Sequence, residues 1–252
     1  MENIFVPRLA LFFLVGFLAQ IIDGALGMAY GVSANSFLLG FGLPPALASA
    51  SVHTAEVFTT AISGFSHWRF GNIDKQIIKR LAFTGVIGGV IGAYLLSNID
   101  GSAVKPWVAV YLLAMGIRIL VKAFRPVNGV ARAMRKQLPL LGLFGGLLDA
   151  VGGGGWGPVV TTSMLANGEP PRQTIGSVNL TEFFVTLAEA ITFLLTLGLL
   201  DWPVVIGLIV GGAIAAPLGA LLTKKIPTKI MLIVVGLLVI GLQIRTLVQV
   251  WF

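Results

Sequence analysis

Apolar residues run along this chain in long stretches separated by short polar segments. Most of the runs approach the ~20 residues that a helix needs to cross the hydrocarbon core of a bilayer. They cover residues 9–39, 46–65, 81–96, 107–124, 138–166, 178–200, 204–222 and 230–250. No segment between them is long and polar enough to fold as a soluble domain. The pattern predicts an all-α polytopic membrane protein.

Composition agrees with this pattern and excludes several kinds of chemistry. Hydrophobic residues make up 56% of the chain and charged residues 11%, against roughly 45–50% and ~25% in soluble domains. With no cysteine and two histidines, we expect no disulfide, no thiol nucleophile, no metal centre and no cofactor. The net charge of +7 comes from basic residues between the apolar runs. Lipid headgroups explain these residues better than a nucleic-acid partner does.

The two halves of the chain carry the same pattern. DGALGMAYGV from Asp23 and DAVGGGGWGP from Asp149 align at an offset of 126 residues. The same offset aligns the Pro-Pro pairs at 44–45 and 170–171, and then SVHTAE with SVNLTE. These matches predict a duplicated unit within one integral membrane domain, with a first transmembrane repeat at 1–126 and a second at 127–252.

Loop charge predicts that the two repeats have opposite orientations. Lys and Arg flank cytoplasmic ends of membrane helices, and they gather here at 69–80, 122–136 and 224–229. The loop at Asp201 has no nearby Lys or Arg, although its repeat partner at Asp74 is strongly basic. Equivalent loops therefore face opposite sides, which requires an odd number of crossings in each half.

An odd count follows if each leading segment, 9–41 or 138–166, forms a broken-helix hairpin before three ordinary transmembrane helices. The glycine-rich stretch would then be the hairpin tip. The alternative is eight simple spans with parallel halves, which would leave Lys224, Lys225 and Lys229 on the wrong side of the membrane.

Two such tips would meet near the midplane, where secondary transporters bind their substrates at half-helix N-termini. Irregular backbone at that depth is tolerated where it is buried in protein or lines a cavity. The helices that start after Ala29 and Gly155 are expected to present unpaired N–H groups to an anion. The predicted substrate-binding residues are Gly27, Met28, Tyr30, Gly31, Ser51, His53, Gly153, Gly154, Gly155, Trp156, Ser177 and Asn179.

Close helix packing is the other explanation for glycine at these positions. Packing alone is expected for the G-x-x-x-G pairs at 85 and 89, 88 and 92, and 207 and 211.

A polar stripe follows each hairpin. His53, Glu56, Thr60 and Ser63 are spaced 3, 4 and 3 residues apart, which places them on one face of a helix. The second half repeats the spacing with Asn179, Glu182, Thr186 and Glu189. Ionisable groups inside spans are costly and usually face a pathway. The predicted coupling and pathway residues are Asp23, Glu56, Asp149, Glu182 and Glu189, although Asp23 and Asp149 could equally cap the glycine turns.

The duplicated D-x-x-x-G-x-x-x-G segment, followed by Pro-Pro and then SVHTAE or SVNLTE, resembles the sulfite exporter TauE/SafE family, also called TSUP. The resemblance covers essentially the whole chain. It implies a multi-pass transporter in the cytoplasmic membrane of a bacterium or archaeon, commonly an exporter of sulfite, sulfonates and related organosulfur anions.

The residues and the resemblance lead to one main hypothesis and two alternatives. The main hypothesis is a secondary transporter, an exporter of a small organosulfur anion that binds at the midplane. Because ionised Glu56 and Glu182 would repel an anion, at least one of them is expected to bind a proton or a cation. A cation or carboxylate transporter that uses the same glutamates is the first alternative. An intramembrane enzyme is the least favoured, because Ser33 with His53, or Asp23 with Asp149, are the only catalytic candidates.

Overall fold

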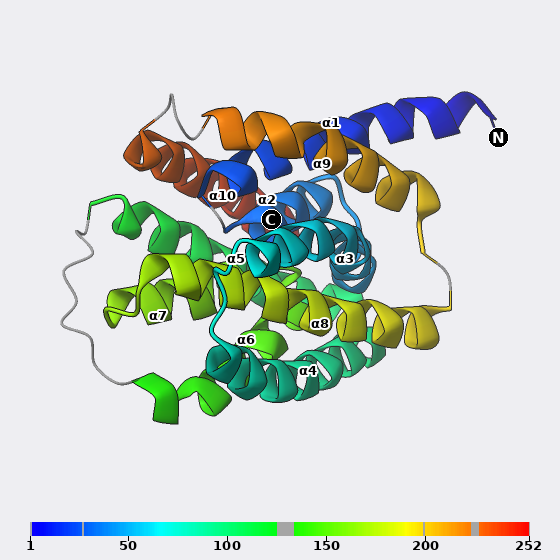
Figure 1. Ribbon diagram of the computed structural model, residues 1–252. Coiled ribbons are helices and arrows are strands. Elements are labelled where there is room, and N and C mark those ends of the chain that lie inside the picture. The colour runs from blue at the N-terminus through cyan, green and yellow to red at the C-terminus, as the bar shows by residue number, and fades with distance from the viewer. Residues whose placement is uncertain (1, 27, 125–133, 199, 223–226, 252) are drawn as a thin grey trace.

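A computed structural model of the protein describes residues 2–26, 28–124, 134–198, 200–222 and 227–251. Within these residues the chain is helical and contains no β-strand (Figure 1). In chain order the elements are α1 (Glu2–Leu26), α2 (Tyr30–Gly40), α3 (Pro45–Arg69), α4 (Lys75–Asn98), α5 (Gly101–Lys122), the 3₁₀ turn η1 (Met134–Lys136), α6 (Leu138–Gly152), the π-helical turn η2 (Gly157–Thr161), α7 (Thr162–Ala166), α8 (Pro171–Leu197), α9 (Trp202–Leu222) and α10 (Thr228–Trp251).

Helix length and composition confirm the predicted class of fold. Among the described residues, four stretches are long and apolar enough to cross a bilayer: Lys75–Asn98, Gly101–Lys122, Arg172–Leu197 and Lys229–Trp251. Their outward-facing side chains include large apolar residues, and exposing this apolar surface to water would be unfavourable. The protein is an all-α polytopic membrane protein.

Both leading segments are broken near the glycine-rich stretches, so neither forms a single uninterrupted helix. The first break separates α1 from α2, and Ala29 in it has a left-handed backbone with φ of 95°. The second break follows α6, where Gly153 has φ of 63° and Gly154 has φ of 140°. Only glycine adopts the second of these conformations readily, because any side chain would meet its own backbone. The chain then continues through η2 into α7.

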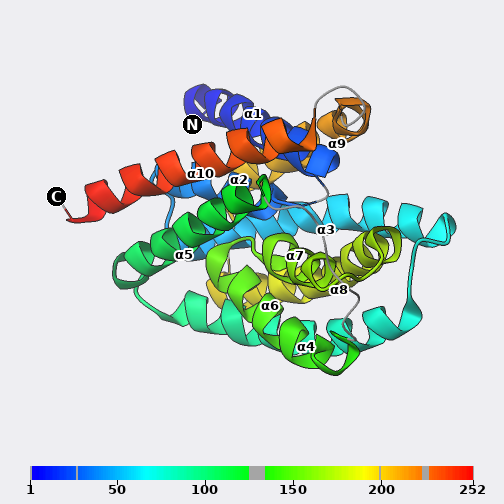
Figure 2. The same ribbon diagram turned by 90° about the vertical axis from the view of Figure 1, so that its left-hand side faces the viewer.

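Two closely packed helix pairs each contain one helix from the first half of the chain and one from the second. In the repeat predicted from the sequence, α1 corresponds to α6 and α4 corresponds to α9. The structure packs α1 against α9 and α6 against α4. Figures 1 and 2 place these two pairs on opposite sides of the molecule, with α3 and α8 packed together between them.

Two of the predicted glycine pairs lie where these helices touch, and a Cβ added in the third pair, at Gly85 or Gly89, would meet Trp156 or α8. A Cβ added at Gly88 of α4 would lie 2.9 Å from the Leu143 carbonyl carbon of α6, and one added at Gly211 of α9 would lie 2.8 Å from the Phe17 nitrogen of α1. Real side chains do not approach backbone this closely, so glycine is required for the two helices to pack at this distance. The packing role predicted for these pairs is confirmed.

The two ends of the helix bundle differ in their polar contacts. At one end Arg135 pairs with Asp74 over 3.3 Å, and Arg172 donates to the Phe70 carbonyl over 3.2 Å. These contacts bring the first two basic loops together. At the other end, Arg8 of α1 pairs with Asp201 at the start of α9 over 2.5 Å. The basic residues Lys224 and Lys225 of the third predicted loop lie outside the described residues.

Candidate functional site

The two helix breaks touch one another in the centre of the molecule. A Cβ added at Gly31, at the start of α2, would lie 2.6 Å from the Gly154 Cα and 3.1 Å from the Gly153 carbonyl oxygen. The contact is therefore backbone against backbone. Segments separated by more than a hundred residues in sequence meet here. The cavity and the buried ionisable side chains lie around this contact.

An aspartate caps the helix that follows each break. Asp149 Oδ1 accepts hydrogen bonds from the N–H groups of Gly155 and Trp156, over 2.7 and 2.9 Å. Asp23 Oδ1 accepts from the Tyr30 N–H over a longer 3.3 Å. The expectation that these N–H groups would be free to bind an anion is wrong at Gly155 and Trp156, because the carboxylate of the same segment already occupies them. Both aspartates also line the central cavity of the protein. Each of them therefore caps a helix and faces the cavity at the same time.

The C-terminal carbonyls of α6 are bonded by the first half of the chain. Asn35 of α2 donates to the Gly152 carbonyl, and Ser49 of α3 donates to the Ala150 carbonyl over 2.6 Å. His53 Nε2 lies 3.2 Å from the Asp149 carbonyl. The last carbonyls of a helix lack intrahelical partners. Asn35 and Ser49 supply such partners, whereas the Asp149 carbonyl beside His53 also accepts the Gly154 N–H. The three side chains join the two halves of the chain beside the second break.

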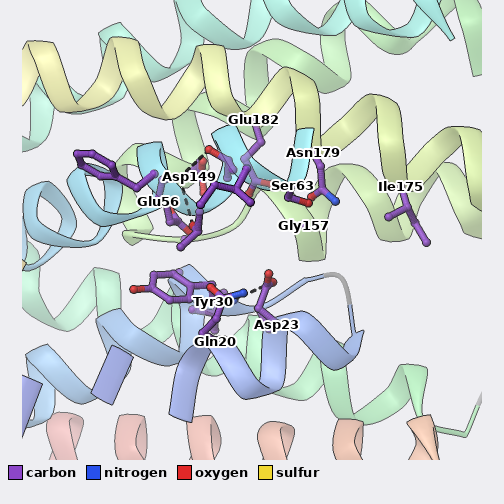
Figure 3. Close-up of a pocket in the computed structure, with 18 of the residues that line it drawn as sticks. Gln20, Asp23, Tyr30, Glu56, Ser63, Asp149, Gly157, Ile175, Asn179 and Glu182 are labelled. Carbon is purple, nitrogen blue, oxygen red and sulfur yellow. Dashed lines mark hydrogen bonds between the residues drawn. The ribbon is translucent and has the colours of Figure 1, made fainter. Parts of the chain in front are cut away.

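A cavity of about 710 Å³ adjoins the two breaks. Figure 3 shows Gln20, Asp23 and Tyr30 on one side of it and Glu56, Asp149, Glu182 and Asn179 on the other. From Glu56 and Asp149 the cavity extends to Ser66, His67 and Ile175, near the end of the bundle where α3 finishes and α8 begins. Cavities of this size accommodate small solutes together with water.

Four carboxyl groups line the cavity, from Asp23, Glu56, Asp149 and Glu182, and none of its described lining residues is Lys or Arg. Uncharged hydrogen-bonding groups surround them, on Gln20, Tyr30, Thr59, Thr60, Ser63, Ser66 and Asn179. Such a lining offers hydrogen bonds to a polar solute and repels an anion when the carboxyls are ionised.

A buried group of ionisable side chains lies at the cavity wall and directly behind it. His53 Nδ1 is 3.1 Å from Glu56 Oε2 and also 3.1 Å from Glu189 Oε2. Both Glu189 oxygens and Asp149 Oδ2 are buried and have no hydrogen-bond partner. Of these four residues, His53 and Glu189 do not line the cavity, whereas Glu56 and Asp149 do.

Donor atoms of His53, Asp149 and Glu189 lie within 4.8 Å of one another, close enough for one cation to bridge them. Both His53 ring nitrogens, however, already face an oxygen. Asp149 Oδ1 is likewise occupied by two N–H groups. A shared proton fits this geometry better than a metal ion, because a metal ion would need a lone pair of His53 and both ring nitrogens face oxygens at hydrogen-bond distance.

The structure separates the residues predicted from sequence into two sets. Nine line the cavity: Asp23, Tyr30, Gly31, Glu56, Asp149, Gly154, Gly155, Asn179 and Glu182. Outside the described cavity lining are Met28, Ser51, His53, Gly153, Trp156, Ser177 and Glu189. Gly27 lies outside the described residues.

Local contacts explain the positions of the second set. Trp156 is fully buried among apolar residues and donates to the Val178 carbonyl. Ser177 accepts from the Asp74 N–H over 2.7 Å, at the end of the bundle. Met28 Sδ lies 3.1 Å from Lys122 Nζ. These three residues hold helices together rather than face the cavity.

Three residues beside the site were not predicted from the sequence: Gln20, Asn35 and Ser49. Gln20 lines the cavity, and its Oε1 is buried without a partner. A glutamine inside the apolar run at 9–39 was a usable signal, because polar groups within spans are rare. Asn35 and Ser49 donate hydrogen bonds to the carbonyls of α6. No sequence pattern within the first half predicts contacts with the second half.

Broken helices that meet beside a buried polar cavity, inside an apolar helical bundle, are typical of a membrane transporter. Comparison with known proteins agrees. The family model described as "Sulfite exporter TauE/SafE" matches residues 12–246, and the chain belongs to this family.

Several bacterial proteins are similar to the chain. "Probable membrane transporter protein YtnM" of Bacillus subtilis (strain 168) is 44% identical, over 97% of this chain and 84% of the relative. YdhB of the same organism, also named a probable membrane transporter protein, is 26% identical over 88% of this chain and 93% of the relative. A "Probable membrane transporter protein" of Haemophilus influenzae is 28% identical over 90% of this chain and 88% of the relative. No solved structure matches the chain.

Proposed function

We propose that this membrane transporter carries a small organosulfur anion, such as sulfite or a sulfonate, out of the cell through the cavity beside the two helix breaks. The observation that carries the proposal is the contact of Gly31 with Gly154 at the cavity. Two discontinuous helices that meet at one point are the arrangement around which secondary transporters alternate access. The family description supplies the class of solute.

The packing of α1 against α9 and of α6 against α4 supports a further part of the proposal, that residues 1–126 and 127–252 are inverted repeats. The caps support it as well, because Asp23 with Tyr30 and Asp149 with Trp156 occupy equivalent positions and form the same hydrogen bond. We propose that the protein lies in the cytoplasmic membrane of a bacterium, because the relatives described above come from bacteria.

The acidic lining sets a condition on anion transport. An anion can occupy the cavity only when enough of its four carboxyls bind a proton or a cation, because unscreened like charges repel strongly in a medium of low dielectric constant. Cation transport is the competing function, and the specific observation that favours it is the absence of Lys and Arg from the described lining.

Flux measurements on the purified protein in proteoliposomes distinguish the two functions. We expect counterflow of ³⁵S-labelled methanesulfonate or sulfite, and competition between the two anions. Glu182→Gln, which keeps the shape of a lining residue and removes its charge, is expected to change this flux. Transport of a monovalent or divalent cation without any requirement for an anion would refute the anion proposal.

Access to the cavity can be tested separately. The bundle end where Arg69, Lys75 and Arg135 gather is expected to face the cytoplasm, so the cavity extends towards the cytoplasm in this conformation. The chain contains no cysteine, so single cysteines can be introduced directly. We expect Phe70→Cys to be protected from an impermeant maleimide added to whole cells, and Ile99→Cys to react. Reversed labelling would contradict this orientation.

A further inference from the structure

The hydrogen bonds of His53 define which of its ring nitrogens can exchange a proton. Nε2 faces the Asp149 carbonyl oxygen over 3.2 Å. A carbonyl can only accept, so Nε2 carries a hydrogen and donates it. Proton exchange is thereby left to Nδ1, and Nδ1 is the nitrogen that faces both glutamates.

The two glutamates lie equally near His53 Nδ1 but differ in their access to the cavity. Glu56 lines the cavity and can exchange protons with water there. Glu189 of α8 is fully buried, and neither of its oxygens has a hydrogen-bond partner. A buried carboxyl without donors is expensive to keep ionised in an apolar surrounding. Glu189 is therefore expected to bind a proton, and it can take part in coupling only if that proton has a route to the cavity.

Other routes to Glu189 are blocked in this conformation. A Cβ added at Gly89 of α4 would lie 2.5 Å from Glu189 Oε1, so this helix packs directly on the carboxyl. One turn further along α8, Phe193 is fully buried and its ring is parallel to that of His53, with 6.2 Å between the ring centroids. The cavity-lining Asp149 has a carboxylate oxygen within 4.8 Å of Glu189 but forms no hydrogen bond with it, so among the described ionisable side chains His53, at 3.1 Å, lies nearest to Glu189.

We propose that His53 is a proton relay between the cavity and Glu189, and that this relay couples solute movement to proton movement. The inference rests on the proposed transport function and extends it by naming the coupled ion and the residues that carry it. A proton on Glu56 Oε2 passes to His53 Nδ1, and the same Nδ1–H then passes to Glu189 Oε2. The first carboxyl loses one proton, the second gains one, and His53 returns to its neutral form with Nε2–H still donated to Asp149.

The charged and titratable groups around the relay come from four helices. The carboxyl of Asp149 on α6 lies on the cavity side, where its Oδ2 has no partner. Glu182 on α8 lies on the same side of the cavity, and Asp23 on α1 and Tyr30 on α2 lie across it. The charge on each of these groups can affect proton transfer through His53. None of them offers His53 Nδ1 a second acceptor as near as Glu56 and Glu189.

The repeat itself provides the conservative test of the relay. His53 corresponds to Asn179 in the second half, so His53→Asn installs a residue that the protein already uses at the equivalent position. Asn can hydrogen-bond but cannot carry a proton. We expect this variant to keep counterflow of labelled methanesulfonate, because exchange requires no net proton movement.

A pH gradient should separate the variant from the wild type. Methanesulfonate is fully ionised at every pH used, and a gradient of one unit supports about tenfold accumulation at a ratio of one proton to one anion. We expect the wild type to accumulate the anion and to acidify the vesicle interior. His53→Asn and Glu189→Gln are expected to lose both effects. Glu169→Gln, a matched carboxyl change in the loop before α8, should behave like the wild type. Accumulation by His53→Asn at the wild-type level would overturn the relay.

A second measurement does not depend on the solute. Infrared difference spectra after a pH step on the reconstituted protein should contain a carboxyl band that Glu189→Gln removes. The same band should be absent from His53→Asn, because Glu189 then has no route for proton exchange. If the Glu189 band responds to pH in His53→Asn, or if a chelator abolishes it in the wild type, the relay is wrong. Absence of methanesulfonate counterflow from the wild type would instead count against the proposed function.

Discussion

Replacing Gly154 by alanine is expected to remove most of the folded protein. The residue has φ of 140°, and an added Cβ would lie 2.5 Å from the Gly31 Cα and closer still to the neighbouring backbone atoms. Backbone on both sides of the contact prevents relief by side-chain rotation. Backbone strain and overpacking each cost about 1–3 kcal/mol. The yield of monodisperse protein in detergent and its melting temperature measure the effect.

Gly71→Ala is the matched control for this change. Gly71 also has positive φ, 68°, but no atom lies within 4 Å of its added Cβ. We therefore expect only the conformational cost of about 1–2 kcal/mol. If Gly154→Ala were instead well folded but unable to bind solute, the glycine would serve as an anion cradle rather than a packing site, as the sequence had suggested.

The second large effect is expected from Asp149→Ala. The change leaves the Gly155 and Trp156 N–H groups buried without an acceptor, at about 1–3 kcal/mol for each unsatisfied group. Asp149→Asn keeps an oxygen at the Oδ1 position and should retain most of the stability. Asp23→Ala should cost less, because Asp23 accepts one longer bond. Thermal unfolding followed by tryptophan fluorescence ranks the three variants, and equal losses for Asp149→Ala and Asp149→Asn would contradict the capping role.

The hydrophobic pattern of the sequence was sufficient to predict the class of fold. Long apolar runs predicted the all-α membrane fold because a bilayer requires about 20 apolar residues for each crossing. The glycine-rich stretches located both helix breaks, since only glycine readily adopts φ values such as that of Gly154. The spacing of His53 and Glu56 correctly placed both on one helix, where they are in contact.

Long-range contacts account for what the sequence could not predict. Trp156 follows the glycines directly, yet its ring turns into an apolar cluster with Val178 and Val185 rather than into the cavity. A pattern within one segment does not reveal which neighbour a side chain will meet. Capping was one of the two roles predicted for Asp23 and Asp149, but the sequence did not show that Asp149 would occupy the Gly155 and Trp156 N–H groups expected to bind an anion.

The bonds that join α6 to the first half are not matched at the aligned positions of the second half. Asn35, Ser49 and His53 donate to the α6 carbonyls, but their equivalents in the second half are Thr161, Ile175 and Asn179. Isoleucine has no donor at all. If the two halves are inverted repeats, as we propose, they have become unequal where they meet. The first half supplies three side chains to the α6 carbonyls, and its histidine has no counterpart in the second half.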